Sequence, residues 1–398
     1  MEHLFSQQCI SIFIFWILTM KTIDSKKWFI SYIIVFVIIL LFLAGMIVAI
    51  DPFFHYHKPL NFLYYDFSGG QRYINDGITK HFDYDAIITG TSMTENFRAS
   101  EVDSIYDVHS IKVPFSGGSY KEMNDNLAKG YESGHNIKVI IRGLDYGRLL
   151  DAPDAMRYDL GTYPLYLYDD NLFNDAKYVL NQDVLSRCAY MLRDFKNKKE
   201  GGIADFDTYS YWMGGYINEW GRKGVIGDRH FYADPEEINE LSEEDKDNIK
   251  KNITQNVTSL AKQHPETTFY YFFSPYSAAQ WGSFYESGDL NRMIDAEEEA
   301  IKLILEVPNI KLFSFNNCKF TNNIYNYKDA SHYGEWINSY MLRKMHEGKC
   351  LLTKENYEKY LKEERELRNN FNYDYLCRYQ DIKTQPSTGP HLPSGKWG

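Results

Sequence analysis

The sequence predicts an α/β domain built on a parallel sheet, preceded by one membrane-spanning helix. From residue 86 onwards, short apolar segments alternate with segments of helical character, which is typical of a parallel sheet covered by helices on both faces. The chain has 398 residues and is 44% hydrophobic, enough for a sizeable core. Ahead of the alternation, residues 28–50 form 23 consecutive residues without a charge.

This uncharged segment, residues 28–50, is long enough for a helix across a hydrocarbon core of roughly 30 Å. Lys21, Lys26 and Lys27 precede it and Asp51 follows, so the positive-inside rule places the N-terminus in the cytoplasm and the rest outside. No small-residue cleavage site follows, which favours a retained anchor over a signal peptide. We expect a single-pass protein of the cell membrane with its main domain on the extracytoplasmic side.

A second apolar stretch, residues 9–20, is too short to span alone. Either Met20 is the natural start, or residues 1–27 form a cytoplasmic segment with a re-entrant or interfacial part; the sequence leaves both open. Residues 51–80 are aromatic and rich in turn residues, and we expect a juxtamembrane connector there. His55 and His57 within it have no clear carboxylate partner, so we interpret them as interfacial and not as metal ligands.

The main domain is expected over residues 81–348. Five segments are predicted as strands: 86–90, 109–115, 137–145, 267–275 and 310–315. Helices are expected near 94–104, 119–132, 290–305 and from about Tyr333, and Ser242 with Asp245 predicts a capping box for another. Residues 151–235 lack a clean period and are interpreted as an insertion over one end of the sheet. A C-terminal helical extension (349–384) and a disordered tail (385–398) complete the chain.

Charge and cysteine content exclude several classes of protein. The formal net charge is −11, which lacks the basic footprint of a general nucleic-acid binder. Five cysteines, at positions 9, 188, 318, 350 and 377, include no C-x-x-C pair, which argues against a zinc knuckle or a thioredoxin-like site. Pairing between some of them stays open, and neither a metal nor a cofactor is expected.

Ser92 is the first candidate for chemistry. It follows the first predicted strand in the segment "AIITGTS", at the edge where ligands bind in open α/β sheets. A serine at this junction has two interpretations, the cap of the following helix or a nucleophile.

Asp329 and His332 favour the nucleophile. They lie in "DASH" after the last predicted strand, and residues three apart in a helical turn or tight loop face the same side. The aspartate can accept the Nδ1–H of the imidazole, which leaves Nε2 to take a proton from a serine. The alternative interpretation is a solvated Asp-His pair at a helix start.

The sequence resembles the SGNH/GDSL hydrolase superfamily in three places together: Gly90-Thr91-Ser92, the glycines after the second strand, and Asp329-x-x-His332. The closest likeness is its membrane-anchored extracytoplasmic branch, which includes the teichoic-acid D-alanyl transfer protein and the alginate acetylation proteins. The resemblance covers roughly residues 80–345. It implies a flavodoxin-like three-layer α/β/α fold, with Ser92 as nucleophile, His332 as base and Asp329 orienting it.

The oxyanion hole departs from the family pattern. The resemblance implies donors from the Ser92 N–H and from a glycine N–H after the second strand, here Gly117 or Gly118. The family's next block carries an asparagine, but the matching place here is Asp145 in "RGLDYGR". Because an ionised carboxylate cannot donate a hydrogen bond, the third donor is missing or supplied differently.

Four further residues are candidates to line the substrate site. Arg142 and Asp145 end the third predicted strand, where they either contact substrate or pair with each other. Tyr276 and Trp281 follow the fourth predicted strand, where aromatic rings either stack on sugars or pack as a lid.

Two functions from different classes remain at this point. The first is a membrane-anchored serine esterase or O-acyltransferase that acts on acyl esters of cell-envelope glycopolymers. The second is a non-catalytic protein that uses the same cleft to bind an envelope polymer or an integral-membrane O-acyltransferase. A wide separation between Ser92 and His332 would favour the second.

Overall fold

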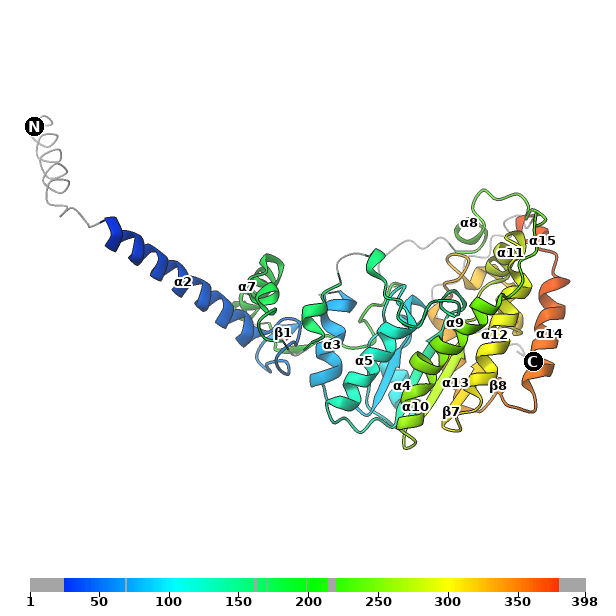
Figure 1. The fold of residues 1–398 in the computed structure, drawn as a ribbon, viewed down its shortest axis with the longest axis horizontal. Helices are drawn as coiled ribbons and strands as arrows, with labels where there is room; N and C mark the ends of the chain where they lie inside the picture. Colours follow the sequence, from blue (N-terminus) through cyan, green and yellow to red (C-terminus); the bar gives the residue numbers. More distant parts are fainter. Residues whose placement is uncertain are drawn as a thin grey trace, which may run out of the picture.

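The protein is a mixed α/β structure with a mostly parallel sheet and one N-terminal apolar helix (Figure 1). The computed structural model describes residues 25–68, 70–160, 163–169, 171–197, 199–213 and 220–378. The apolar stretch 9–20 and the tail 385–398 lie outside the described residues.

The main sheet has six strands in the order β3-β2-β4-β6-β7-β8. Pairing is parallel from β3 to β7, and β8 joins β7 in the antiparallel sense. The strands are β2 (Ala86–Thr89), β3 (Ser110–Lys112), β4 (Val139–Leu144), β6 (Thr268–Phe273), β7 (Ile310–Ser314) and β8 (Leu351–Leu352). The five predicted strands are confirmed, although β3 is shorter than expected. The two-residue β8 carries too little pattern for a sequence-based prediction.

Five helices pack as one group: α3 (Gln71–His81), α5 (Tyr120–Glu132), α9 (Glu243–Ile253), α10 (Ser259–Gln263) and α12 (Leu290–Ile304). Within this group, α5 packs against α3. It also packs against the five-residue π-helix Thr254–Thr258, which lies between α9 and α10. Helices α4 (Ala99–Tyr106) and α13 (Glu335–His346) pack against each other. Capping boxes begin α5 at Ser119 and α9 at Ser242, and the second was predicted. Helix α3 was not predicted, because the turn-rich composition of residues 51–80 obscured it.

The remaining helices complete the C-terminal half and the insertion. Helix α11 (Ala278–Glu286) follows β6, and α14 (Tyr357–Asn369) and α15 (Asp374–Arg378) lie within the predicted C-terminal extension. The insertion contains α6 (Ala176–Val179), α7 (Gln182–Lys196) and α8 (Arg222–Val225), and its strand β5 (Gly202–Ile203) pairs in parallel with β1 (Tyr64–Tyr65).

Helix α2 (Ser25–Ile50) projects from the rest of the molecule and meets it at its C-terminal end, beside α6 and α7 (Figure 1). It is long and apolar enough to cross a membrane. Its large side chains are solvent-exposed, with Trp28 at 58% and Phe42 at 69%. Exposed apolar surface on this scale is unusual for a helix that stays in water.

A tight connection follows α2. The buried Asp51 carboxylate accepts hydrogen bonds from the backbone N–H groups of residues 55, 56 and 57 at 3.0, 2.6 and 3.0 Å. It also accepts one from the Tyr178 hydroxyl at 2.7 Å. On α3, a Cβ at Gly77 would lie 2.5 Å from the carbonyl oxygens of Phe53 and Phe54. This close approach fixes the start of the α/β domain against the end of α2.

A buried carboxyl pair joins α12 to α14. The Tyr360 hydroxyl lies 3.1 Å from Glu297 Oε1 and also contacts Glu364. Both glutamates are fully buried. Burial, and then the neighbouring Glu364 carboxyl, raise the pKa of Glu297 well above its ordinary value. The neutral form of Glu297 therefore stabilises the folded state.

The buried pair of Glu297 and Glu364 predicts that the protein becomes less stable at alkaline pH. Because the pKa of Glu297 is raised in the folded state, the stabilisation that neutral Glu297 provides is complete below the unfolded-state pKa. This stabilisation is lost as the pH rises through the folded-state pKa. Glu297→Gln should increase the free energy of unfolding at pH 8 by about 1–3 kcal/mol and flatten its decline between pH 5 and pH 8. Urea titrations measure both. Glu298→Gln, at an exposed pair with Lys302, is the control, and equal effects of the two would contradict the account.

Candidate active site

The turn after β2 places Ser92 at the carboxyl edge of the sheet. Gly90 adopts φ +150°, and a Cβ there would lie 2.5 Å from Thr94 Cγ2, so the turn requires glycine. Thr91 caps the 3₁₀ helix Ser92–Thr94 by accepting the Met93 N–H at 3.4 Å. The capping role considered for Ser92 thus belongs to Thr91, and the Ser92 hydroxyl is directed elsewhere.

His332 lies in a tight loop before α13. Tyr327 and Tyr333 form an antiparallel bridge across it, and the Lys328 N–H donates to the His332 carbonyl oxygen at 3.0 Å. The Asp329 carboxylate accepts the backbone N–H groups of Ser331 and His332 at 3.0 and 2.8 Å. Asp329 and His332 therefore share a tight loop, one of the two geometries that their spacing predicted.

The structure brings Ser92, His332 and Asp329 together. Ser92 Oγ lies 2.7 Å from His332 Nε2, across 240 positions of sequence. His332 Nδ1 lies 2.9 and 2.8 Å from the two Asp329 carboxylate oxygens. With the Nδ1–H donated to Asp329, Nε2 is the acceptor that faces the serine hydroxyl. All three residues are partly exposed, so a substrate can reach them.

Asp329 remains ionised well into the acid range. Burial alone would raise its pKa, but the hydrogen bond from the His332 ring, the charge of that ring and the backbone N–H groups outweigh it and lower the pKa of Asp329 to about 2. An ionised carboxylate at this place stabilises the imidazolium that forms when His332 takes a proton.

Two contacts hold the histidine loop against the serine turn. The Tyr333 hydroxyl and the Asn338 amide both donate to the Met93 carbonyl oxygen, at 3.2 and 3.4 Å. On its other side the loop is tied to the segment after β6, where the Ser277 hydroxyl donates to the Ala330 carbonyl oxygen at 2.6 Å. The short contact between Ser92 and His332 is thus supported from both flanks.

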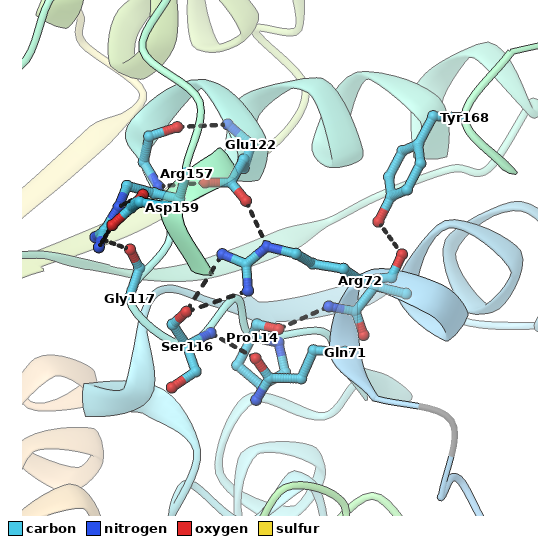
Figure 2. A network of polar contacts seen from close by, with 11 residues as sticks. Gln71, Arg72, Pro114, Ser116, Gly117, Glu122, Arg157, Asp159 and Tyr168 are labelled. Carbon is cyan, nitrogen blue, oxygen red and sulfur yellow. Dashed lines mark hydrogen bonds and ion pairs between the residues drawn. The ribbon is translucent and has the colours of Figure 1, made fainter. Parts of the chain in front are cut away.

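The loop after β3 lies next to Ser92. Ile88 pairs with Lys112, and beyond this pair the Val113 N–H donates to the Ile88 carbonyl oxygen at 2.9 Å. The Phe115 N–H donates to the Gly90 carbonyl oxygen at 2.8 Å. Figure 2 shows how α3 holds this loop: Gln71 Oε1 accepts the Ser116 N–H at 2.5 Å, and Arg72 donates to the Ser116 carbonyl oxygen at 3.3 Å.

The two candidate glycines differ in this loop. The Gly118 N–H donates to the Phe115 carbonyl oxygen at 2.7 Å, so a turn already uses it. Gly117 has φ +61°, and Arg157 Nη1 fixes its carbonyl oxygen at 2.5 Å (Figure 2). Neither the Gly117 N–H nor the Ser92 N–H has a hydrogen-bond partner among the described residues. Of the three N–H groups expected from the sequence, those of Ser92 and Gly117 are therefore able to donate to a ligand, whereas that of Gly118 already donates within the protein.

Asp145 also reaches the site. Thr89 pairs with Arg142 across β2 and β4, and Asp145 directly follows the last residue of β4. Its side chain is 5% exposed and contacts the Thr91 hydroxyl. Burial raises the pKa of Asp145 above its ordinary value, against the lowering effects of the Ser274 and Thr91 hydroxyls and of His332 and Arg148.

The other three lining candidates are buried. Arg142 does not pair with Asp145. Instead its guanidinium donates to the carbonyl oxygens of Asn256 in the π-helix and of Tyr120, at 2.7 and 3.1 Å, and it is fully buried. Trp281 is also fully buried and packs edge-on against the Tyr146 ring, so it cannot stack on a sugar. Tyr276 is 9% exposed and packs on Tyr146, which corresponds to the lid-packing alternative.

An aromatic cluster that the sequence reasoning missed adjoins the histidine. The Trp212 ring packs edge-on against the His332 ring at 5.9 Å between centroids, and Lys328 Nζ lies 3.8 Å from the Trp212 ring centre. Trp220 and Trp336 continue the cluster. The signal was present, because two tryptophans in the irregular insertion and one directly after "DASHYGE" are unusual for solvent-exposed loops.

No protein-family model matches this chain, and neither does any curated protein. Within the described residues, no group of three or more His, Cys, Asp or Glu side chains is arranged to hold a metal ion. The cysteines at 188, 318, 350 and 377 are free thiols, and Cys9 lies outside the described residues.

Removal of the Asp329 charge should slow the reaction of Ser92 with a fluorophosphonate probe without unfolding the protein. In Asp329→Asn the amide can no longer hold His332 in the required tautomer, so we expect the rate at which a fluorophosphonate probe labels the chain to fall about 10³- to 10⁴-fold. Gel fluorescence over time measures this rate. Asp247→Asn, which removes an equal charge from an exposed pair with Lys251, should retain the rate, and a similar fall in both variants would count against the assignment.

The stability of the protein should depend on Arg72, which holds the loop after β3. Its Nε lies 2.8 Å from Glu122, whose side chain is 0% exposed. Arg72→Met keeps the apolar stem but leaves this buried charge uncompensated, so unfolding should become easier by about 3 kcal/mol.

Two further variants test the cause of that loss. Adding Glu122→Gln to Arg72→Met should restore most of the stability, because the amide still accepts the Ser119 N–H that Glu122 now accepts at 2.7 Å. Arg365→Met removes a more exposed pair with Asp295 and should cost less than about 1 kcal/mol. Chemical denaturation compares them, and a double variant no more stable than Arg72→Met would contradict the charge-based explanation.

Proposed function

We propose that this protein is a membrane-anchored serine esterase or O-acyltransferase that acts on acyl esters of cell-envelope glycopolymers. The observation that carries the proposal is the 2.7 Å contact between Ser92 Oγ and His332 Nε2, with Asp329 on the opposite ring nitrogen. A nucleophile, a base and an orienting carboxylate in this order are the requirements for nucleophilic acyl transfer.

The reaction proceeds in two steps, the acylation and the deacylation of Ser92. Ser92 Oγ attacks the acyl carbon while its proton passes to His332 Nε2, and the carbonyl electron pair moves onto the oxygen. Collapse of this intermediate expels the alcohol, which takes the proton from His332 and leaves the acyl group on Ser92. Water or a sugar hydroxyl then gives its proton to His332 and attacks the acyl-serine. The same steps in reverse release Ser92.

The Ser92 and Gly117 N–H groups serve as oxyanion donors in this scheme. Preorganised backbone donors stabilise the charge that develops on the carbonyl oxygen. The Gly90 turn and the contacts of Arg157, Gln71 and Arg72 set their positions. Because Gly118 N–H is already bonded within its turn, Gly117 is the better of the two glycines.

The choice of a glycopolymer substrate rests on the surroundings of His332. Partly exposed Trp212 lies against the imidazole and carries Lys328 over its ring. Aromatic faces beside a reacting centre suit the apolar face of a sugar ring, and Lys328 suits an anionic polymer. Helix α2 as a retained anchor would confine the enzyme near such a polymer and raise its effective concentration. The N-terminus would lie in the cytoplasm and the domain outside.

The fold assignment forms part of the same proposal. The strand order β3-β2-β4-β6-β7 corresponds to the 2-1-3-4-5 order of flavodoxin-like sheets, which supports a three-layer arrangement and kinship with the SGNH/GDSL superfamily. The non-catalytic alternative is a protein that binds an envelope polymer or an integral-membrane O-acyltransferase, and a wide separation between Ser92 and His332 would have favoured it. Their 2.7 Å separation favours the enzyme.

A fluorophosphonate probe tests the proposal on the full chain in detergent micelles. The wild type should be labelled rapidly, and Ser92→Ala should lose this rapid labelling, because an activated serine attacks the probe much faster than ordinary side-chain nucleophiles do. Ser283→Ala, which removes a hydroxyl that donates within α11, controls for the loss of a serine hydroxyl away from the site and should still be labelled. Equal labelling of the wild type and Ser92→Ala would exclude Ser92 as the nucleophile.

A further inference from the structure

Large apolar side chains gather on the surface around α6 and α7. Among the described residues of 63–157 and of 239–374, no large apolar side chain is exposed. Around α6 and α7, in contrast, the exposed fraction lies between 40% and 94% for six side chains, which together are called the α7 surface: Phe62, Phe173, Leu180, Tyr190, Leu192 and Phe195. Exposed apolar side chains gathered in one region mark a place that a partner or a membrane covers.

The α7 surface belongs to a packed element and not to a loose loop. Helix α7 buries Val184 and Cys188. Tyr190 follows Cys188 by two positions, about 200° around the helix, so its ring points away from the buried face. At the end of the helix, the Phe195 ring packs edge-on against the Phe62 ring at 5.8 Å between centroids. The surface therefore has a fixed shape.

The α7 surface adjoins the apolar helix α2. Both α6 and α7 pack against the C-terminal part of α2 (Figure 1), where Ile47 and Ile50 are buried and Met46 packs on the core. The uncharged residues before this covered end, 28–45, make a helix of roughly 27 Å at about 1.5 Å per residue, close to the roughly 30 Å of a hydrocarbon core. A membrane that α2 crosses would therefore end at about the level where α6 and α7 begin to cover the helix.

We propose that the α7 surface lies in the headgroup region of the membrane that α2 crosses, with its apolar side chains against phospholipids. This inference rests on the retained anchor of the proposed function and adds a second contact with the bilayer. Aromatic rings are enriched at this depth of a membrane. The Arg193 guanidinium lies 4.9 Å from the centre of the Tyr190 ring, and its long stem lets the charge reach lipid phosphate from there.

The charges beside the α7 surface are balanced. The Asp194 carboxylate lies 3.7 Å from Arg193 and 3.4 Å from Lys199, so these two cations share one acidic partner. Burial of apolar area, and not attraction to anionic lipid, is therefore the main driving force for the contact. A bilayer of neutral phosphatidylcholine should be sufficient to cover the surface.

A second contact with the bilayer would fix the orientation of the α/β domain. A domain that is held only by one helix can tilt about its tether, whereas a contact along α7 holds it against the membrane. The partly exposed Ser92 and His332 would then face an envelope polymer in a constant orientation, which preserves the gain in effective concentration that a tether provides.

Photo-crosslinking of the full chain, purified alone and placed in phosphatidylcholine nanodiscs, tests the proposal. Tyr190→p-benzoylphenylalanine and Phe195→p-benzoylphenylalanine probe the α7 surface, and Val37→p-benzoylphenylalanine probes α2, where Val37 is 43% exposed. Ile238→p-benzoylphenylalanine is the control, because Ile238 is 62% exposed and lies near Gly288 after α11, at the opposite end of the molecule from α2 (Figure 1). On irradiation the benzophenone carbonyl inserts into a nearby C–H bond, and intact mass spectrometry detects the chain with one lipid added.

We expect the lipid adduct at position 37 and at one or both of positions 190 and 195, and none at position 238. An adduct at position 37 with none at 190 and 195 would overturn the proposal and leave the anchor intact, and a surface reserved for a partner protein would give this result. Equal adducts at 190, 195 and 238 would also overturn it. No adduct at position 37 would overturn the anchor and the proposal with it. The fluorophosphonate labelling rate of each variant reports on Ser92 and not on lipid, so it separates a failure of the proposed catalysis from a failure of the membrane contact.

Discussion

The candidate site depends on the parallel pairing of β2 with its neighbours β3 and β4. Parallel strands all end at one edge, so their loops meet there. This pairing brings the turn after β2, which carries Ser92, against the loop after β3 and against Asp145 at the end of β4. The strands that fix this register bury apolar side chains, with Ile87, Ile111 and Ile140 at 0% exposure. Sliding any one of them would expose its core face to the opposite layer.

Buried polar groups divide into two kinds around this edge. Arg142 Nη1 and Nη2 and Lys112 Nζ donate to backbone carbonyl oxygens, and Lys112 reaches those of Glu95 and Phe97 at 2.6 and 2.9 Å. Such groups tie loops to the sheet. Asp145 keeps one oxygen unbonded next to Ser92. Since satisfied groups stabilise and unsatisfied ones cost free energy, Asp145 Oδ1 and the likewise partnerless Arg142 Nε reduce the stability of this edge.

The strands and the Asp329–His332 pair could be predicted from sequence because their signals are local. The contact of this pair with Ser92, 240 positions away, was expected from the sheet edge and the family resemblance. Strand β6 is an unbroken apolar segment, and Asp329 and His332 lie within one loop that their spacing describes. Arg142 and Trp281 were misplaced because their burial is decided by distant partners, the Asn256 carbonyl oxygen and the Tyr146 ring. Trp212 was missed because the insertion has no period that would assign it to a face. The choice between Gly117 and Gly118 required a single backbone hydrogen bond that no sequence pattern encodes.

The central claim is that Ser92 carries the acyl group during turnover. Rapid acid quenching of the full chain with p-nitrophenyl acetate, followed by trypsin and peptide mass spectrometry, locates that group. The account predicts one acetyl group on the peptide 81–98, at Ser92, and its absence from Ser92→Ala. Turnover that is lost in Ser92→Ala but leaves no acetyl group on this peptide, or acetylation at another residue that forms and decays at the turnover rate, would contradict it.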